Sequence, residues 1–191
     1  MKALVMLSGG VESTALLKHA LDNDIEVEAV HAYWDNKTKH EALAARAISN
    51  YYDIQYSDMG IQADDLFKKY RNITVPDSPW WGSVAVMAAP IVKCTEIWFG
   101  SYLGESAPGA SGPAGVNLIL QSVGCEARTK SPLYRKTKSE QWDMLDDNVK
   151  EMVVSCIKQY KHNGENCIKR NVKDPCQKCK EWAKWQIVRG V

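Results

Sequence analysis

A short apolar segment, followed at once by two glycines and a helical pattern, constrains this chain more than any other feature. Residues Lys2 to Leu7 read KALVML, which is almost wholly apolar. Such a run is typical of a strand that is covered on both faces, as in a parallel sheet. Ser8-Gly9-Gly10 follows, and a helix is predicted from about Glu12 to Leu21. The chain therefore opens with a buried strand, a tight loop and a helix.

The rest of the sequence alternates between strand and helix patterns. Strands are predicted at 25–32, 54–56, 95–99 and 126–130, helices at 39–51, 62–70, 82–93, 137–145 and 147–154, a helical turn at 117–123, and loops at 72–81 and 101–115. Strands that alternate with helices form βαβ units and a parallel sheet with helices on both faces. Because the crossovers are right-handed, we expect a doubly wound α/β sheet of about five strands.

The ends of the predicted strands locate a binding site. Ligands of doubly wound sheets bind outside the carboxyl ends of the strands. Ser8, Tyr33 and Gly100 each follow a predicted strand directly. We therefore expect these three positions to lie near a bound molecule.

Composition excludes several classes of protein. Of 191 residues, 45% are hydrophobic and 25% are charged, which is typical of a globular protein and excludes a disordered or collagen-like chain. Lys and Arg total 24 against 23 Asp and Glu, so the net charge of +1 provides no long-range field for nucleic acid or an anionic membrane. The first apolar run is too short for a membrane span and lacks the pattern of a secretory signal, so the expected compartment is the cytoplasm.

Four cysteines gather near the end of the chain and predict a metal site. Two domains are expected, a nucleotide-binding domain at 1–154 and a Cys-rich zinc-binding tail with a C-terminal helix at 155–191. The predicted ligands are Cys156, Cys167, Cys176 and Cys179. The last two form a C-x2-C pair, and four thiolates suit a closed structural Zn²⁺ site. Cys94 and Cys125 are expected to be inert thiols in or near the core.

The loop after the first strand has the composition of a phosphate-binding turn. Gly9 and Gly10 let the backbone approach an anion, and the first amides of the following helix point toward it. Ser8, Ser13 and Thr14 add hydroxyl groups. The loop matches neither G-x-x-x-x-G-K-[ST] nor G-x-G-x-x-G, which disfavours kinase, GTPase and dinucleotide-binding activities. An ordinary glycine turn capped by serine is the simpler interpretation.

Ser8-Gly9-Gly10-Val11-Glu12-Ser13 resembles the S-G-G-x-D-S motif of the PP-loop ATP pyrophosphatases, with Glu12 in place of the usual Asp. Later segments are similar to the 7-cyano-7-deazaguanine synthases (the QueC-like family) within that group. These segments are Tyr33-Trp34-Asp35 with His40-Glu41, Ser131-Pro132-Leu133, Thr137-Lys138-Ser139-Glu140 and Ser155-Cys156. The Arg-Asn pair of that family is absent, and the spacing of the tail cysteines differs.

The resemblance implies an adenine nucleotide alpha hydrolase-like fold and an ATP-dependent carbon–nitrogen ligase. Such an enzyme adenylates 7-carboxy-7-deazaguanine and converts it with ammonia into the amide and then the nitrile, with ATP, Mg²⁺ and Zn²⁺ as cofactors and a homodimer as the expected assembly. The implied catalytic residues are Ser8, Glu12, Ser13 and Lys138, and the implied nucleotide-binding residues are Leu7, Ser8, Gly9, Gly10, Ser13, Thr14, Tyr33 and Gly100.

Three other functions fit parts of the sequence. A variant enzyme could stop at the amide, given the Glu12 substitution. A sulfur-transfer or sulfonucleotide enzyme would use the same loop and needs a reactive cysteine near the carboxyl ends of the strands, for which Cys125 is the candidate. A zinc-dependent nucleic-acid-binding module would use the lysines of the tail but would leave the phosphate loop unused.

The cysteine tail generates the first testable prediction. Aliphatic residues are few between Lys158 and Lys180, so metal ligation would supply the energy that orders this segment. Removing zinc with a chelator should make the tail rapidly cleaved by trypsin, while 1–154 stays resistant. The measurement is a time course of digestion followed by mass spectrometry. Equal cleavage of the tail with and without chelator would contradict the prediction.

Overall fold

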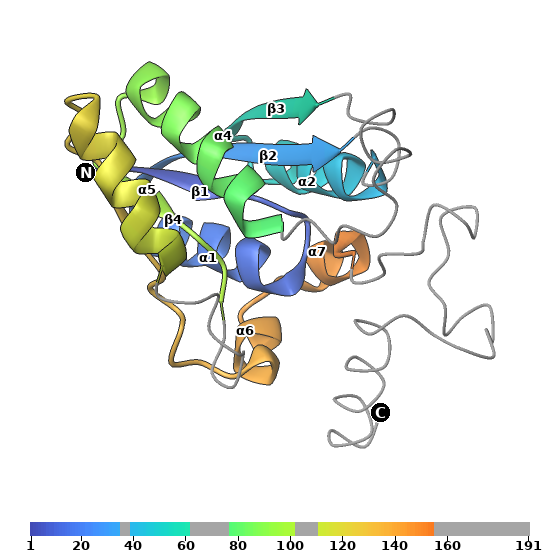
Figure 1. The fold of residues 1–191 in the computed structure, drawn as a ribbon. Coiled ribbons are helices and arrows are strands. Elements are labelled where there is room, and N and C mark those ends of the chain that lie inside the picture. Colours follow the sequence, from blue (N-terminus) through green and yellow to red (C-terminus); the bar gives the residue numbers. More distant parts are fainter. Residues whose placement is uncertain (35–38, 62–76, 102–110, 155–191) are drawn as a thin grey trace.

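The computed structural model describes residues 1–34, 39–61, 77–101 and 111–154, and Figure 1 shows how these parts are arranged. Its sheet has five parallel strands in the order β3-β2-β1-β4-β5. The strands are β1 (Lys2–Met6), β2 (Glu26–Trp34), β3 (Gln55–Ile61), β4 (Glu96–Trp98) and β5 (Arg128–Lys130). The helices are α1 (Val11–Asp22), α2 (Lys39–Tyr51), α4 (Asp77–Val92), α5 (Ser111–Ser122), α6 (Lys138–Asp143) and α7 (Asp147–Met152). The predicted parallel α/β sheet is confirmed.

Strand β1 lies at the centre of the sheet because its side chains are apolar on both faces. It pairs with β2 on one side, where Ala3 is opposite Val27, and with β4 on the other, where Val5 is opposite Trp98. Successive side chains of a strand point to opposite faces, so Ala3 and Val5 enter one layer of the core and Leu4 enters the other. A polar residue on either face of β1 would therefore be buried without water.

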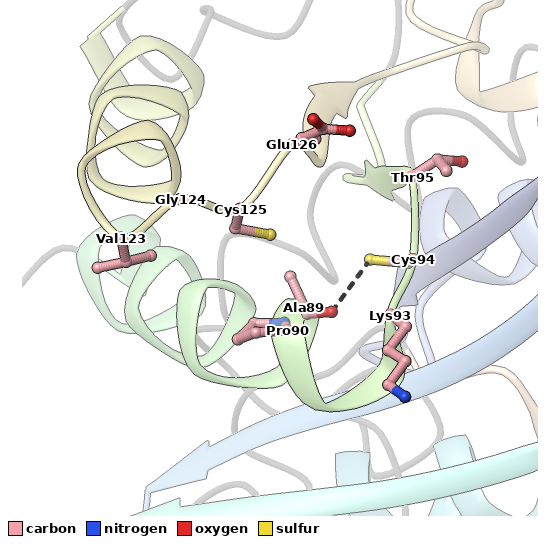
Figure 2. Close-up of a pocket in the computed structure, with 9 residues that line it drawn as sticks. All are labelled: Ala89, Pro90, Lys93, Cys94, Thr95, Val123, Gly124, Cys125 and Glu126. Atoms are coloured by element: carbon pink, nitrogen blue, oxygen red, sulfur yellow. Dashed lines mark hydrogen bonds between the residues drawn. The ribbon is translucent and has the colours of Figure 1, made fainter.

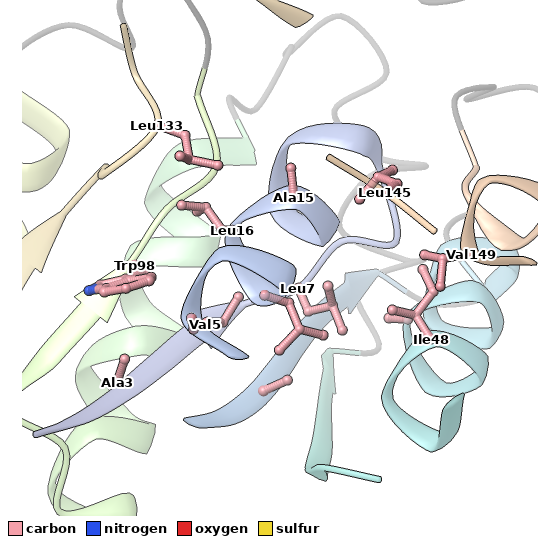
Figure 3. Close-up of a cluster of buried hydrophobic side chains, with 14 residues drawn as sticks. Ala3, Val5, Leu7, Ala15, Leu16, Ile48, Trp98, Leu133, Leu145 and Val149 are labelled. Atoms are coloured by element: carbon pink, nitrogen blue, oxygen red, sulfur yellow. The ribbon is translucent and has the colours of Figure 1, made fainter. Parts of the chain in front are cut away.

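The core consists of two layers, one on each face of the sheet. The first layer packs α1, α2 and the segment around α6 and α7 against the sheet, and Figure 3 shows Leu16, Ile48, Leu133 and Val149 converging on β1. The second layer packs α4 and α5 on the opposite face, through Val84, Ala85, Val116 and Leu120. Helices on both faces are what a doubly wound sheet requires.

The strand order reverses between β1 and β4. From β1 the chain moves outward to β2 and β3, then returns to place β4 and β5 on the other side. In doubly wound sheets, a crevice forms at this switch point, outside the carboxyl ends of the two strands. The loop after β1 and Gly100 after β4 both lie there.

Two predicted loops are shorter than expected. The predicted loop at 72–81 includes the start of α4, which begins at Asp77, and the predicted loop at 101–115 includes the first turn of α5, which begins at Ser111. Helix α4 begins Asp-Ser-Pro and α5 begins Ser-Gly-Pro, residues that favour loops by composition but also suit a first helical turn. The predicted helix at 62–70 and the tail from 155, and with it the predicted domain division, lie outside the described residues.

Each helix in the described ranges is too short or too polar to cross a membrane.

Candidate functional site

The loop Ser8–Gly10 joins the central strand to the first turn of α1 and requires glycine at its middle position. Gly9 has a φ of 76°, which lies in the left-handed region that favours glycine. A Cβ atom on Gly9 would lie 2.9 Å from the Cβ of Ala44 and 3.0 Å from the backbone nitrogen of Ala45, both in α2. The loop therefore lies directly against α2, and its backbone is held by contact on one side.

Serine side chains tie the two ends of this loop together. The Ser8 backbone amide donates to Ser13 Oγ at 3.0 Å, and the two serine hydroxyl oxygens are also 3.0 Å apart. The Gly10 amide donates to Ser8 Oγ at 3.3 Å. These bonds hold the turn in one conformation, so its backbone is preorganised before any ligand binds.

The N-terminus of α1 is suited to an anion. Gly10 is the N-cap residue and, having no side chain, forms no side-chain cap. The first backbone amides of a helix lack partners within the helix, and they carry the positive end of the helix dipole. A phosphate group at this point would accept hydrogen bonds from these amides. The loop can therefore hold phosphate oxygens mainly by backbone donors.

Glu12 and Lys138 form an ion pair beside this loop. The Nζ atom of Lys138 lies 2.7 Å from Oε1 of Glu12, and both side chains are about four-fifths buried, with 18% and 20% exposed. Lys138 is the first residue of α6, which begins with a capping box between Thr137 and Glu140. Two predicted catalytic residues from distant parts of the sequence are thus in direct contact.

Gly100 forms the opposite side of the site. A Cβ atom on Gly100 would lie 2.8 Å from the backbone nitrogen of Ser13 and 2.9 Å from the carbonyl carbon of Glu12. The chain leaving β4 therefore passes directly over the first turn of α1. Here glycine is required by close approach of two backbones.

Other predicted residues are placed less directly in the site. Leu7 is fully buried, and its carbonyl oxygen accepts a hydrogen bond from Nδ1 of His31 at 2.8 Å. Thr14 is also buried, and its hydroxyl donates to the carbonyl oxygen of Gly10 at 2.7 Å. Tyr33 is the penultimate residue of β2, and its side chain lies outside the description. The side chains of Leu7 and Thr14 therefore support the loop from the side of the core.

The basic residues near β5, namely Arg128, Lys130 and Arg135, are exposed. Arg128 donates to nearby backbone carbonyls, and Lys130 pairs with Glu96. Arg135 lies over the ring of Tyr134. Trp81 packs against the second core layer and makes an edge contact with His31.

The two cysteines of the described chain lie at the opposite ends of the strands from the phosphate loop. Cys94 precedes β4 and Cys125 precedes β5, so both lie at the amino ends of parallel strands and line the same cavity (Figure 2). Burial raises the pKa of the Cys94 thiol to about 11, which keeps it protonated near neutral pH. The expected inert character of Cys94 fits this position.

The predicted zinc ligands Cys156, Cys167, Cys176 and Cys179 lie outside the described residues. In the part of the chain that the structure describes, there is no group of three or more potential His, Cys, Asp or Glu ligands. The zinc site therefore stays a prediction from sequence.

Sequence reasoning missed Gln141. It lies within the predicted helix at 137–145, yet it is fully buried and donates hydrogen bonds to backbone carbonyls of the loops after β4 and β5. The available signal is weak, because five of the six residues of α6 (KSEQWD) are polar and the sequence does not show which of them is buried. That signal does not identify the partners.

Comparison with known families supports the resemblance. The family model described as queuosine biosynthesis protein QueC matches residues 2–74, which include the phosphate loop, α1 and α2. The resemblance to this family is confirmed over that part of the chain. No curated protein matches the sequence significantly.

Solved structures share the fold. The U34-tRNA thiolase NcsA from Methanococcus maripaludis, with its 4Fe-4S cluster, has a TM-score of 0.51 at 15% identity, over 100% of this chain and 71% of its own. The NH3-dependent NAD synthetase from Campylobacter jejuni has a TM-score of 0.50 at 20% identity, over 88% of this chain and 77% of its own. These neighbours share the predicted parallel α/β fold.

The Gly9 contacts generate a prediction about stability and binding. Gly9→Ala should lower the free energy of unfolding by about 3 kcal/mol, because it adds a steric overlap with α2 to the cost of a left-handed backbone. It should also abolish ATP binding. Denaturant unfolding and calorimetric titration with ATP measure the two effects.

Gly124 provides a matched control. It has a φ of 73°, but a Cβ atom there would meet nothing within 4 Å. Gly124→Ala should therefore cost only about 1 kcal/mol and leave ATP binding unchanged. Equal losses of stability in the two variants would show that contact with α2 does not constrain Gly9.

Proposed function

We propose that this chain is an ATP-dependent ligase that converts 7-carboxy-7-deazaguanine with ammonia into the amide and then the nitrile, 7-cyano-7-deazaguanine. The observation that carries the proposal is the QueC family match over 2–74, which includes the loop whose backbone is preorganised for phosphate. The match supports an ATP-using enzyme of nucleotide modification, and the choice of substrate and product is our proposal.

The first half-reaction activates a poor electrophile. A carboxylate oxygen of the substrate attacks the α-phosphorus of ATP, and pyrophosphate leaves with the electron pair of the broken P–O bond. Ammonia then attacks the carbonyl carbon of the acyl adenylate, and AMP and a proton leave to give the amide. Positioning and charge stabilisation supply most of the catalysis in such transfers.

The second half-reaction repeats the activation on the amide. The amide oxygen attacks the α-phosphorus of a second ATP and again releases pyrophosphate. Loss of AMP and a proton from the adenylated amide leaves the carbon–nitrogen triple bond. The same phosphate site serves both steps, so the loop needs no rearrangement between them.

In this proposal, each residue of the site has a distinct role. The loop residues Ser8, Gly9, Gly10 and Ser13 hold the β- and γ-phosphates, while the buried Thr14 supports their loop through its bond to Gly10. Lys138 offsets the charge that builds on departing pyrophosphate. Tyr33 and Gly100 border the nucleotide, and the buried Leu7 supports the loop from the core. Glu12, whose carboxylate is the kind of oxygen ligand that Mg²⁺ prefers, would hold that ion. Magnesium supplies charge neutralisation on the phosphates when bound.

The position of the two described cysteines disfavours sulfur transfer through either of them. A sulfur carrier would need a thiol near the carboxyl ends of the strands, where the loop lies. Cys94 and Cys125 lie at the amino ends, across the full length of the sheet. Product analysis decides whether the reaction stops at the amide. Measurement of the mass in solution decides whether the chain forms a homodimer.

Product analysis tests the proposed reaction. The protein is incubated with ATP, Mg²⁺, ¹⁵N-labelled ammonium and 7-carboxy-7-deazaguanine, and the products are identified by mass spectrometry. We expect labelled nitrile together with two AMP and two pyrophosphate per nitrile. Labelled amide alone would limit the reaction to its first half, and release of ADP would overturn the proposal.

The Lys138 variant tests the assigned role. Lys138→Met should lower kcat by about 100-fold, the typical cost of removing one stabilising charge at a developing anion. Lys2→Met is a matched control, since Lys2 also forms a partly buried ion pair, with 22% of its side chain exposed, but at the amino end of β1. The control should keep its turnover within about twofold of the unmodified chain. Equal losses in both variants would remove Lys138 from the site.

A further inference from the structure

Gln141 is the buried residue of the short helix α6, and its amide reaches both loops beside the site. We propose that Gln141 is a positioning residue, which fixes the segment leaving β4 over the first turn of α1 and so sets the wall of the phosphate site opposite the loop. What this wall binds rests on the proposed function. That Gln141 holds the wall in place is a property of the chain alone.

The amide nitrogen of Gln141 makes three contacts with backbone carbonyls. Nε2 lies 2.7 Å from the carbonyl oxygen of Ser101, 3.2 Å from that of Leu133 and 3.3 Å from that of Lys136. Because all three partners are acceptors, the nitrogen must face them, and the orientation of the amide is determined. One side chain therefore joins the start of the loop after β4 to the loop between β5 and α6.

The other end of the amide shows that packing alone does not explain this residue. Oε1 of Gln141 is buried and has no hydrogen-bond partner among the described residues. A buried acceptor without a partner lowers stability, and an apolar side chain would fill the same space next to Leu133 without that penalty. The contribution of Gln141 is therefore the geometry that its nitrogen imposes.

The contact of Gln141 with Ser101 acts on the phosphate site through the neighbouring Gly100. Ser101 follows Gly100, whose backbone lies against Glu12 and Ser13 in the first turn of α1. Three residues before Gln141 on the same helix, Lys138 pairs with Glu12. Helix α6 thus contacts the start of α1 through an ion pair and holds the adjacent Gly100 segment through Gln141. Without the amide, the segment of Gly100 and Ser101 loses its hydrogen bond to α6.

Gln141→Met tests the inference, because methionine has a similar length and no donor. The readout independent of activity is hydrogen–deuterium exchange at 99–101, which we expect to be slow in the unmodified chain and about tenfold faster in the variant. In ATP–pyrophosphate exchange with the carboxylate substrate, KM for ATP should rise about tenfold while kcat changes by less than about threefold.

Val84→Ala is the matched control, since Val84 is fully buried in the core layer on the other face of the sheet. It should lower Tm and leave both readouts unchanged. Unchanged exchange at 99–101 in Gln141→Met, or fast exchange there in the unmodified chain, would overturn the inference. Failure of the proposed function is a separate result: the unmodified chain would not consume ATP, while the exchange measurement would still decide the role of Gln141.

Discussion

Close contact between backbones at the start of α1 is the constraint on which the rest of the structure depends. Gly9 lies against α2 on one side, and Gly100 lies against Glu12 and Ser13 on the other, in both cases with no room for a Cβ atom. The first turn of α1 is therefore enclosed by main chain, and its amides are presented at the end of the central strand. A site built from main-chain donors needs little reorganisation when an anion binds, which is the property that phosphate chemistry requires.

An ion pair lies beside this main-chain site. The ion pair between Glu12 and Lys138 links α1 to α6, and the buried amide of Gln141 links α6 to the segment after β4. The longer side chain of Glu12, compared with the usual Asp of the motif, is the one that reaches Lys138 here. The substitution that set this chain apart from the family pattern is thus part of the contact between the two predicted catalytic residues.

The parallel sheet places the described cysteines and the phosphate loop at opposite ends of its strands. Because all five strands run in the same direction, residues that precede the strands gather at the amino ends of the sheet. Residues that follow the strands gather at the carboxyl ends. The cysteines of the described chain lie at the amino ends of the strands, and the phosphate loop lies at the carboxyl ends. This separation, and not the reactivity of any one group, argues against sulfur transfer through Cys94 or Cys125.

Local patterns were enough to predict β1, the glycine turn, the helix Lys39–Tyr51 and the class of fold, because apolar periodicity and glycine conformation act over a few residues. The starts of α4 and α5 were missed, since Gly, Pro and Ser suit both loops and first helical turns. Only the tertiary structure decided that Gly100 touches Ser13, that Lys138 pairs with Glu12, and that Gln141 holds Ser101. These contacts join distant segments, and they depend on the order of the strands in the sheet, which periodicity within each segment does not contain.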